Sequence, residues 1–370
     1  MKKLIRRLKD NFCEIGFLCQ KKEIQGNSIA IWSEDDDGNF LPGFKVDLDV
    51  KIWISKKESE NYIEFGITIP ALDSQHTKFN IIIFLPYKTD IDNFEDKGKF
   101  LVTNNKTLEA LFNEDLTISS SQTQFSKVEL KNSKQSFYMF KPDIKSDITY
   151  SEENSENCRG TKLCITIDPN GSLDKDSAIY TRFRINSLGE LFSKQTNKSY
   201  FLSSKKESDL YIDFKVNSPR SLPEKITTRI QSQNFGRIKF FLLTESDKNI
   251  IYNTGKLHKT RLLEKHIWDS YLTVNNATEK REIKRSDDKK IAYHWNQEFT
   301  ENKEQDYSLF VKISYASTNW TTIIIALVVI FVMSVISNFV YDKAKDVYET
   351  SSMSKKNLIK PDINAKKQER

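Results

Sequence analysis

Glycine and proline are scarce in this chain, which has 370 residues but only 11 glycines and 8 prolines. No glycine-rich phosphate loop, nucleophile elbow, paired-histidine zinc helix or EF-hand pattern occurs in it. These absences exclude the enzyme classes that such motifs define, and the sequence predicts no cofactor. The aromatic content of 12% is enough to fill a core, and a chain of this length predicts about two domains.

Cysteine and histidine are also rare, with four residues of each kind. The cysteines form two pairs of equal spacing, Cys13 with Cys19 and Cys158 with Cys164. This spacing is unusual for zinc, so we predict no metal site and favour free thiols over disulfides. The histidines are scattered and are interpreted as surface residues: His76, His258, His266 and His294.

A large excess of one charge is missing too. Lysine and arginine outnumber the acids by 57 to 51, which gives a net charge of +6 with both signs interspersed. Such a balance is typical of an ordinary solvated surface, and nucleic acid is not predicted as a partner.

The N-terminus lacks the uninterrupted apolar core of a secretion signal, because Lys9, Asp10 and Glu14 break it. Residues 1–25 instead predict a basic amphipathic helix with an apolar stripe. The stripe either docks on the protein's own core or contacts a membrane surface. It consists of Leu4, Leu8, Phe12 and Ile15.

One long hydrophobic run is present near the C-terminus. No charged side chain occurs from Ile313 to Tyr341, and about twenty apolar residues span a hydrocarbon core of roughly 30 Å as a helix. Trp320 and Tyr341 mark its ends, where aromatic rings favour the headgroup level. We predict a transmembrane helix over 319–341, followed by a charged tail at 342–370.

Two rules disagree about the orientation of this helix. The tail carries eight basic residues, and the positive-inside rule would place it in the cytosol. That orientation would require export of the large N-terminal domain without a leader, whereas a short tail is far easier to translocate. We therefore predict a single-pass, tail-anchored protein with its large domain in the cytoplasm.

Asn338 lies within the hydrophobic run, four residues after Ser334. An amide in hydrocarbon seeks a partner, so Asn338 could bond to a second copy of the helix and make a homo-oligomer. Alternatively, Asn338 is near enough to the end of the run to reach headgroup water.

The region between the N-terminal helix and the hydrophobic run predicts a mainly β fold. Short runs of β-branched and aromatic residues alternate with period two and are separated by turn residues. We expect two antiparallel β-sandwich-like modules, at 26–140 and 158–315, joined by a polar linker at 141–157. The second module includes a helical basic segment at 255–290. The predicted strands are SIAIW, KVDLDVKIWI, NYIEFGITI, NIIIFL, KLCITI, AIYTRFRI, DLYIDFKV and IKFFLL.

An internal match suggests that the two modules arose by duplication. Residues 55–65 align without gaps to residues 204–214, with eight of eleven positions identical. Chance similarity within a chain rich in lysine, serine and glutamate is the alternative.

Two arginines are the predicted ligand-binding residues. Arg182 and Arg184 lie two apart in a strand and therefore on one face, where they could bind phosphate or carboxylate groups. They could equally pair with an acid on a neighbouring strand, such as Asp213. The acidic run from Ser33 to Asn39 is interpreted as a solvated turn rather than a cation site.

These observations favour a membrane-tethered binding or sensor protein that engages a protein or a small anionic ligand near the bilayer. One alternative is a ligand-sensing membrane effector that oligomerises through its transmembrane helix and perturbs the bilayer. The other is a membrane-bound hydrolase without a recognisable motif. No catalytic residue is assigned, and the membrane-anchoring residues are Trp320, Asn338 and Tyr341.

Overall fold

The structure is a computed structural model. It describes residues 27–41, 45–55, 60–70, 78–155, 158–169, 173–174, 177–186, 188, 192–196, 205–231, 233–272, 289–300, 305–318 and 320–357. The predicted N-terminal helix therefore lies outside the described residues. The chain divides into two units, of which one contains residues up to Gln195 and from Asp209 to Tyr315, and the other contains Thr196–Ser208 and the C-terminal part from Ala316.

Two mixed β-sheets form the first unit. The β1 sheet contains, in spatial order, β15 (Lys248–Asn253), β18 (Tyr307–Thr318), β13 (Lys205–Val216), β1 (Asn27–Asp35), β4 (Phe79–Leu85), β10 (Cys158–Ile167) and β9 (Ile148–Ser155), with β12 (Phe192–Thr196) beside β13. The β2 sheet contains β16 (Leu257–Leu262), β17 (Lys290–Glu298), β14 (Asn234–Glu245), β2 (Lys45–Ile54), β3 (Tyr62–Ile69), β11 (Ala178–Ile185), β8 (Ser136–Phe140), β7 (Phe125–Leu130) and β6 (Leu116–Ser121), with β5 (Phe94–Asp96) beside β11.

The inner faces of the two sheets form the main core. In β2, the alternate residues Val46, Leu48, Val50 and Ile52 are all buried in this core, because successive side chains of a strand point to opposite faces. Full burial of each such side chain contributes about 1.5–3 kcal/mol. The period-two pattern of the sequence thus determines which face of each strand is internal.

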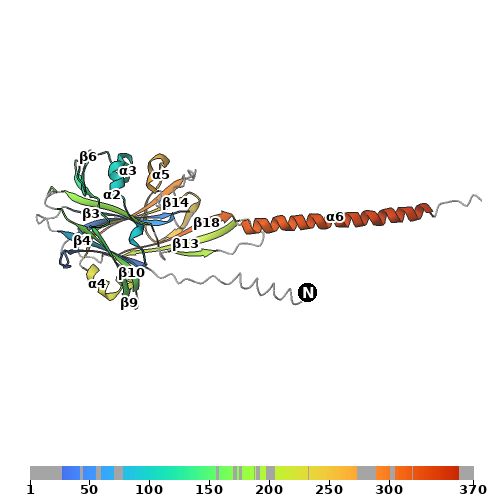
Figure 1. Cartoon of the computed structure of the whole chain (residues 1–370), viewed down its shortest axis with the longest axis horizontal. Coiled ribbons are helices and arrows are strands. Elements are labelled where there is room, and N and C mark those ends of the chain that lie inside the picture. Colours follow the sequence, from blue (N-terminus) through green and yellow to red (C-terminus); the bar gives the residue numbers. More distant parts are fainter. Residues whose placement is uncertain are drawn as a thin grey trace, which may run out of the picture. The chain divides into compact units, whose positions relative to one another are not determined.

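Helices cover the outer faces of both sheets (Figure 1). Helices α2 (Gly98–Thr103), α3 (Asn105–Phe112) and α5 (Lys265–Leu272) pack on the β2 sheet and form a second core there. Helix α4 (Glu224–Ile230) packs on the β1 sheet through Ile226 and Ile230, against Trp32 and Phe84. The unit is therefore a sandwich with a partial helical layer on each side.

The mainly β class and all eight predicted strands are confirmed. The arrangement differs from two separate antiparallel modules in one respect. Strands from both predicted ranges lie side by side within each sheet, and the pairs β1 with β13, β2 with β14 and β8 with β11 are parallel. The apolar face of each strand is buried equally well by a neighbour from the other range, so periodicity alone could not assign partners.

Two local predictions also differ from the structure. The predicted linker at 141–157 contains strand β9, and the predicted helical segment at 255–290 begins with strand β16 before helix α5. The strands that hold the two halves of the internal match, β3 and β13, lie in different sheets. The duplication itself stays a prediction.

Helix α6 (Trp320–Asn357) lies in the second unit. Its stretch Thr322–Ser351 is long and apolar enough to cross a membrane, and none of its most apolar part is buried within the protein. The sequence places the end of the anchor at Tyr341, but the helix continues to Asn357, because residues 342–357 include no proline or glycine to stop it.

Candidate functional site

Charged side chains gather on the outer face of the β2 sheet. Arg184 on β11 lies directly across from Glu64 on β3, and Glu64 lies directly across from Lys51 on β2. The three side chains therefore form one row across three strands. Arg182 lies two residues before Arg184, opposite Gly66. A side chain at Gly66 would approach Arg182 Nη1 to 2.7 Å, so the glycine leaves the space that this arginine occupies.

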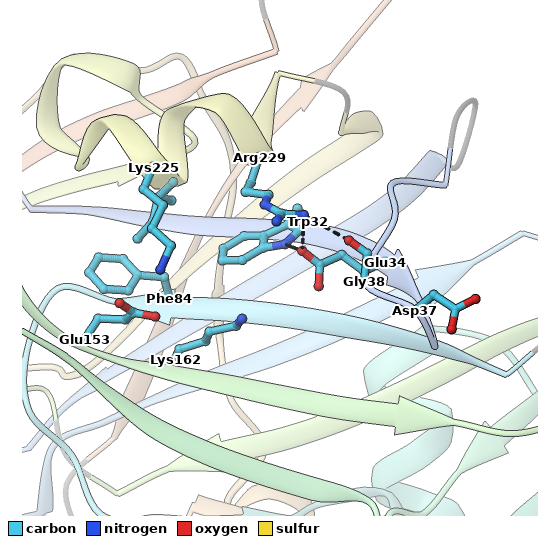
Figure 2. A pocket seen from close by; sticks show the side chains of 10 residues that line it. Trp32, Glu34, Asp37, Gly38, Phe84, Glu153, Lys162, Lys225 and Arg229 are labelled. Carbon is cyan, nitrogen blue, oxygen red and sulfur yellow. Dashed lines mark hydrogen bonds and ion pairs between the residues drawn. The ribbon is translucent and has the colours of Figure 1, made fainter.

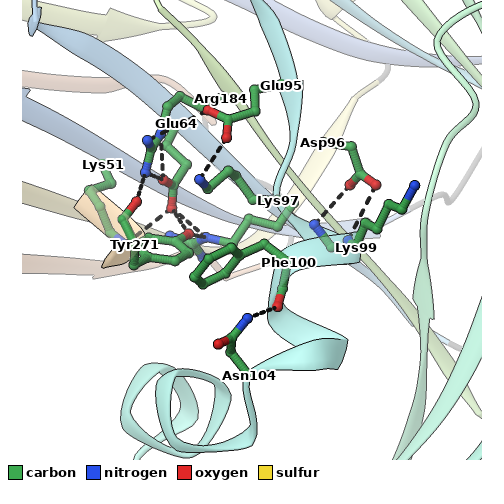
Figure 3. A network of polar contacts seen from close by, with 12 residues as sticks. Lys51, Glu64, Glu95, Asp96, Lys97, Lys99, Phe100, Asn104, Arg184 and Tyr271 are labelled. Carbon is green, nitrogen blue, oxygen red and sulfur yellow. Dashed lines mark hydrogen bonds and ion pairs between the residues drawn. The ribbon is translucent and has the colours of Figure 1, made fainter. Parts of the chain in front are cut away.

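Glu64 is the centre of this buried charge network (Figure 3). Its Oε1 accepts hydrogen bonds from Arg182 Nε at 2.5 Å and from Lys51 Nζ at 3.1 Å. Its Oε2 accepts a bond from Arg184 Nη2 at 3.2 Å. Glu64 and Arg184 are 0% exposed, and Arg182 is 1% exposed. Three buried cations therefore share one carboxylate.

Helix α5 closes the network through Tyr271. The Tyr271 hydroxyl donates to Glu64 Oε1, and its carbonyl accepts from Arg184 Nη2 at 2.6 Å. Lys51 Nζ lies 4.7 Å from the centre of the Tyr271 ring and 5.2 Å from that of Trp268, within the range of cation–π attraction. The helix thus supplies both hydrogen-bond partners and a cover of aromatic rings.

A second acid extends the network toward α2. Lys97 Nζ donates to Glu95 Oε1 at 3.0 Å, and Arg184 Nη1 lies 3.6 Å from Glu95 Oε2. Asp96 accepts from the backbone N–H groups of Gly98 and Lys99 at the start of α2. Burial nonetheless raises the pKa of Asp96 to about 6, because those bonds only partly offset the loss of water.

The charges of the network shift one another's pKa values. Burial alone would raise the pKa of Glu64, but Lys51, Arg182 and Arg184 outweigh it and hold that pKa well below its usual range. Burial and the neighbouring Arg182 lower the pKa of Lys51 to about 7, although Glu64 opposes the shift. Lys51 is thus the member of the row whose charge changes near neutral pH.

The structure brings Arg182 and Arg184 together, as predicted, but encloses them. Both arginines contact Glu64 on the neighbouring strand β3. They therefore pair with an acid on a neighbouring strand, which was the alternative to ligand binding, but the acid is Glu64 and not Asp213. Asp213 lies on β13 in the other sheet and pairs with Lys215 at 2.9 Å. A ligand-binding role for the two arginines stays a prediction, and their geometry favours a structural role. Glu64 was visible in the sequence as the one charge within the apolar run NYIEFGITI.

A pocket of about 210 Å³ opens on the opposite side of the sandwich, between α4 and the outer face of the β1 sheet. Trp32 on β1 and Phe84 on β4 are lining residues that also pack under α4. Phe84 can lie against β10 because Gly160 faces it, and an added Cβ there would come within 2.4 Å of the ring. Three cations line the pocket with them: Lys162 on β10 and Lys225 and Arg229 on α4.

Glu34 fixes the orientation of the pocket's indole ring. Its Oε1 accepts from Trp32 Nε1 at 2.7 Å and from Arg229 Nη1 at 3.1 Å. Arg229 Nη1 also donates to the carbonyl of Gly38 at 3.0 Å. Gly38 has a φ of +80°, a conformation that the turn of this hairpin requires and that glycine adopts at low cost.

Two lysines remain at the pocket as cations that can face a ligand. Lys162 Nζ lies 5.7 Å from the centre of the Trp32 ring. Figure 2 shows the Lys225 side chain reaching from α4 toward Phe84 and Glu153. The acids Glu153 and Asp37 also line the pocket. The rings of Trp32 and Phe84 are 3% and 0% exposed and form the apolar floor beneath these charges. The groups that a ligand would meet first are therefore the charged ones, which suits a ligand with an anionic part.

The remaining predicted positions lie elsewhere in the chain. His258 and His294 meet at 5.1 Å between ring centres, and burial and His258 lower the pKa of His294 to about 4. Among the described residues, no group of three or more His, Cys, Asp or Glu side chains is placed to hold a metal ion. Trp320 begins α6, and Asn338 and Tyr341 lie along it, all three exposed.

Comparison with protein-family models, curated proteins and solved structures finds no match to this chain. The pocket geometry is therefore the basis for the functional proposal below.

Proposed function

We propose that this protein is a membrane-tethered β-sandwich that binds a small anionic ligand in the pocket between α4 and the β1 sheet. One observation carries the proposal: Trp32 and Phe84 line the same pocket as Lys162, Lys225 and Arg229. Lysine ammonium groups favour a carboxylate, sulfonate or phosphate, and the buried rings of Trp32 and Phe84 form the apolar floor of the pocket behind them.

The three cations have different contacts, and this difference supports an anionic ligand. Arg229 is occupied by Glu34 and the carbonyl of Gly38, so it positions the Trp32 ring. Lys162 and Lys225 are the groups that would meet an anion directly. Glu153 and Asp37 would repel a second negative charge, which favours a ligand with one anionic group over a polyphosphate.

A fluorescent probe tests the pocket. The dye 8-anilino-1-naphthalenesulfonate combines aromatic rings with one sulfonate, and its emission rises when it leaves water. We expect the full chain in detergent to bind it, and the double variant Lys162→Gln/Lys225→Gln to bind it about tenfold more weakly, a loss of about 1.4 kcal/mol. Lys106→Gln/Lys131→Gln, with two lysines outside the pocket, is the matched control. Equal binding by all three proteins would contradict the proposal.

The membrane tether is the second part of the proposal. Helix α6 contains the apolar stretch that supports it. We expect the protein to remain with membranes during alkaline carbonate extraction, and a chain without residues 320–341 to be released. A cysteine introduced in the tail at Gln368 should react with an impermeant maleimide from outside intact cells, because we propose that the large domain is cytoplasmic.

Asn338 motivates a second candidate function, an effector that oligomerises through its membrane helix. Because α6 is continuous through this region, Ser334 and Asn338 lie on one helical face. Asn338→Leu should then weaken association of α6, and ion leakage on overexpression should fall with it. Unchanged association and leakage in this variant would remove the support for the effector. The hydrolase hypothesis stays a prediction.

A further inference from the structure

Exposed apolar side chains of the sandwich are confined to its open edges. Outside α6, six large hydrophobic residues of the described chain are exposed. Two lie on β9 or in the turn before it, and four lie on β15 and β16 or at their ends. They are Ile144 and Tyr150 at the first edge, and Ile251, Tyr252, Leu257 and Leu262 at the second.

Within the described residues, strands β9 and β15 end the β1 sheet, and β16 ends the β2 sheet. A terminal strand presents a row of backbone donors and acceptors that a further strand can pair with, and natural proteins usually protect such edges with charge rather than apolar residues. Ile251 and Tyr252 are 59% and 55% exposed on β15. The register of β15 against β18 shifts between Ile250 and Tyr252, so the strand has a local irregularity at this point but no charged side chain on its surface there.

The two edges carry opposite charges. The segment 143–155, which includes β9, contains four carboxylates and one lysine. The segment 248–262, which includes β15 and β16, contains four cations and no acid. Lys248 is buried and paired with Glu245, so Lys256, Lys259 and Arg261 give this edge its positive charge. Two copies of the same edge would therefore repel each other, whereas unlike edges attract.

The directions of the two edge strands, β15 and β9, are compatible with an antiparallel contact between unlike edges. β15 runs antiparallel to β18. β18 runs antiparallel to β13, because Lys312 pairs with Asp209 while Phe310 contacts Tyr211. From β13 the path to β9 passes one parallel and three antiparallel pairings. β15 and β9 therefore run in opposite directions within one copy.

We propose that copies of this chain associate head to tail, with β9 of one copy pairing antiparallel to β15 of the next. Two copies of the β15 edge, or two of the β9 edge, would bring like charges together. When copies follow one another in the same orientation, β9 against β15 is antiparallel and joins opposite charges. This contact covers the exposed side chains of Tyr150, Ile251 and Tyr252. A head-to-tail contact of this kind builds a ring or an open chain of copies.

Cross-linking between two differently tagged populations tests the contact. Both are full-length chains with Cys13, Cys19, Cys158 and Cys164 replaced by serine, mixed in detergent and reconstituted into phosphatidylcholine vesicles. One carries Tyr150→Cys and the other Ile251→Cys. In the mixture, a short bifunctional maleimide should link Cys at position 150 of one chain to Cys at position 251 of the other, giving a product that carries both tags. Neither population should cross-link alone. Thr117→Cys on β6 replaces Tyr150→Cys in the control, and this mixture should give no product.

Charge exchange provides an independent measurement. Lys256→Glu/Lys259→Glu/Arg261→Glu makes both edges acidic, and Asp143→Lys/Glu152→Lys makes both basic. Each variant alone should be a single copy in nanodiscs by mass photometry, while a mixture of the two should associate as the unchanged chain does. Circular dichroism of each variant checks the fold. Cross-linking of Ile251→Cys with itself, or a single copy for the unchanged chain, would overturn the proposal.

Discussion

The two outer faces of the sandwich use charged residues in different ways. On the β2 sheet, Glu64 and its cations are enclosed beneath α5 and bond to one another. On the β1 sheet, the charges beside α4 line a pocket that solvent can enter. The comparison teaches that a cluster of arginines is not in itself a ligand site. What matters is whether the protein has already provided the counter-charges, and on the pocket side two lysines remain to meet a ligand.

Of the variants considered, Glu64→Gln should lower the free energy of unfolding most. A small loss would contradict the contrast between the enclosed face and the open face. The change leaves Lys51, Arg182 and Arg184 buried without their common carboxylate, and breaking a buried ion pair costs about 3–5 kcal/mol. We expect a loss of this size in urea unfolding of the full chain in detergent, followed by tryptophan fluorescence. Asp213→Asn, which removes a partly exposed partner of Lys215, is the control and should cost less than about 1 kcal/mol.

Lys51 should make stability rise with pH on the enclosed side. Its pKa of about 7 in the folded protein is below its value in the unfolded chain. Above pH 7 the unfolded chain therefore binds one proton more, and the free energy of unfolding increases by up to about 1.4 kcal/mol per pH unit. Comparing urea unfolding at pH 7 and pH 9 should show this increase. Lys51→Met should abolish it, and an identical slope in both proteins would refute the assignment.

Arg229→Gln should have a smaller effect, because this side of the molecule is partly open. The Arg229 side chain is 40% exposed, so solvent screens its pair with Glu34. We expect a loss of at most about 1 kcal/mol in unfolding free energy. The variant should also weaken dye binding, since Trp32 loses part of the group that holds its ring. A loss as large as that of Glu64→Gln would show that the two faces do not differ.

Lys162→Gln and Lys225→Gln should change stability least. Neither lysine is needed to compensate a buried charge, so each should alter the unfolding free energy by less than about 0.5 kcal/mol. Their effect should be confined to the binding of the anionic dye. A larger loss of unfolding free energy would indicate that the two lysines stabilise the fold rather than bind a ligand.

Much of the local structure could be predicted from the sequence. The alternation in KVDLDVKIWI places Val46, Leu48, Val50 and Ile52 inward, as found in β2. The same alternation places Lys51 on the outward face, where α5 buries it. Helix α5 is more than two hundred residues away in the chain, and no periodicity within β2 reports which distant element covers its outer face.

The candidate sites were less predictable for the same reason. The spacing of Arg182 and Arg184 shows that they share a face, but their partner Glu64 comes from another strand more than one hundred residues earlier. The pocket joins Trp32, Phe84, Lys162 and Lys225 from four elements, and none of these residues belongs to a local motif. Only strand pairing brings them together.

By itself the sequence determined the mainly β class, the eight strands, the inward face of β2 and the apolar C-terminal helix, because each depends on residues close together in the chain. The tertiary structure alone decided that the two predicted ranges share both sheets, that Glu64 lies among three cations, and that α4 and α5 cover opposite faces. These outcomes depend on which strands pair, and many pairings would bury the same apolar faces equally well.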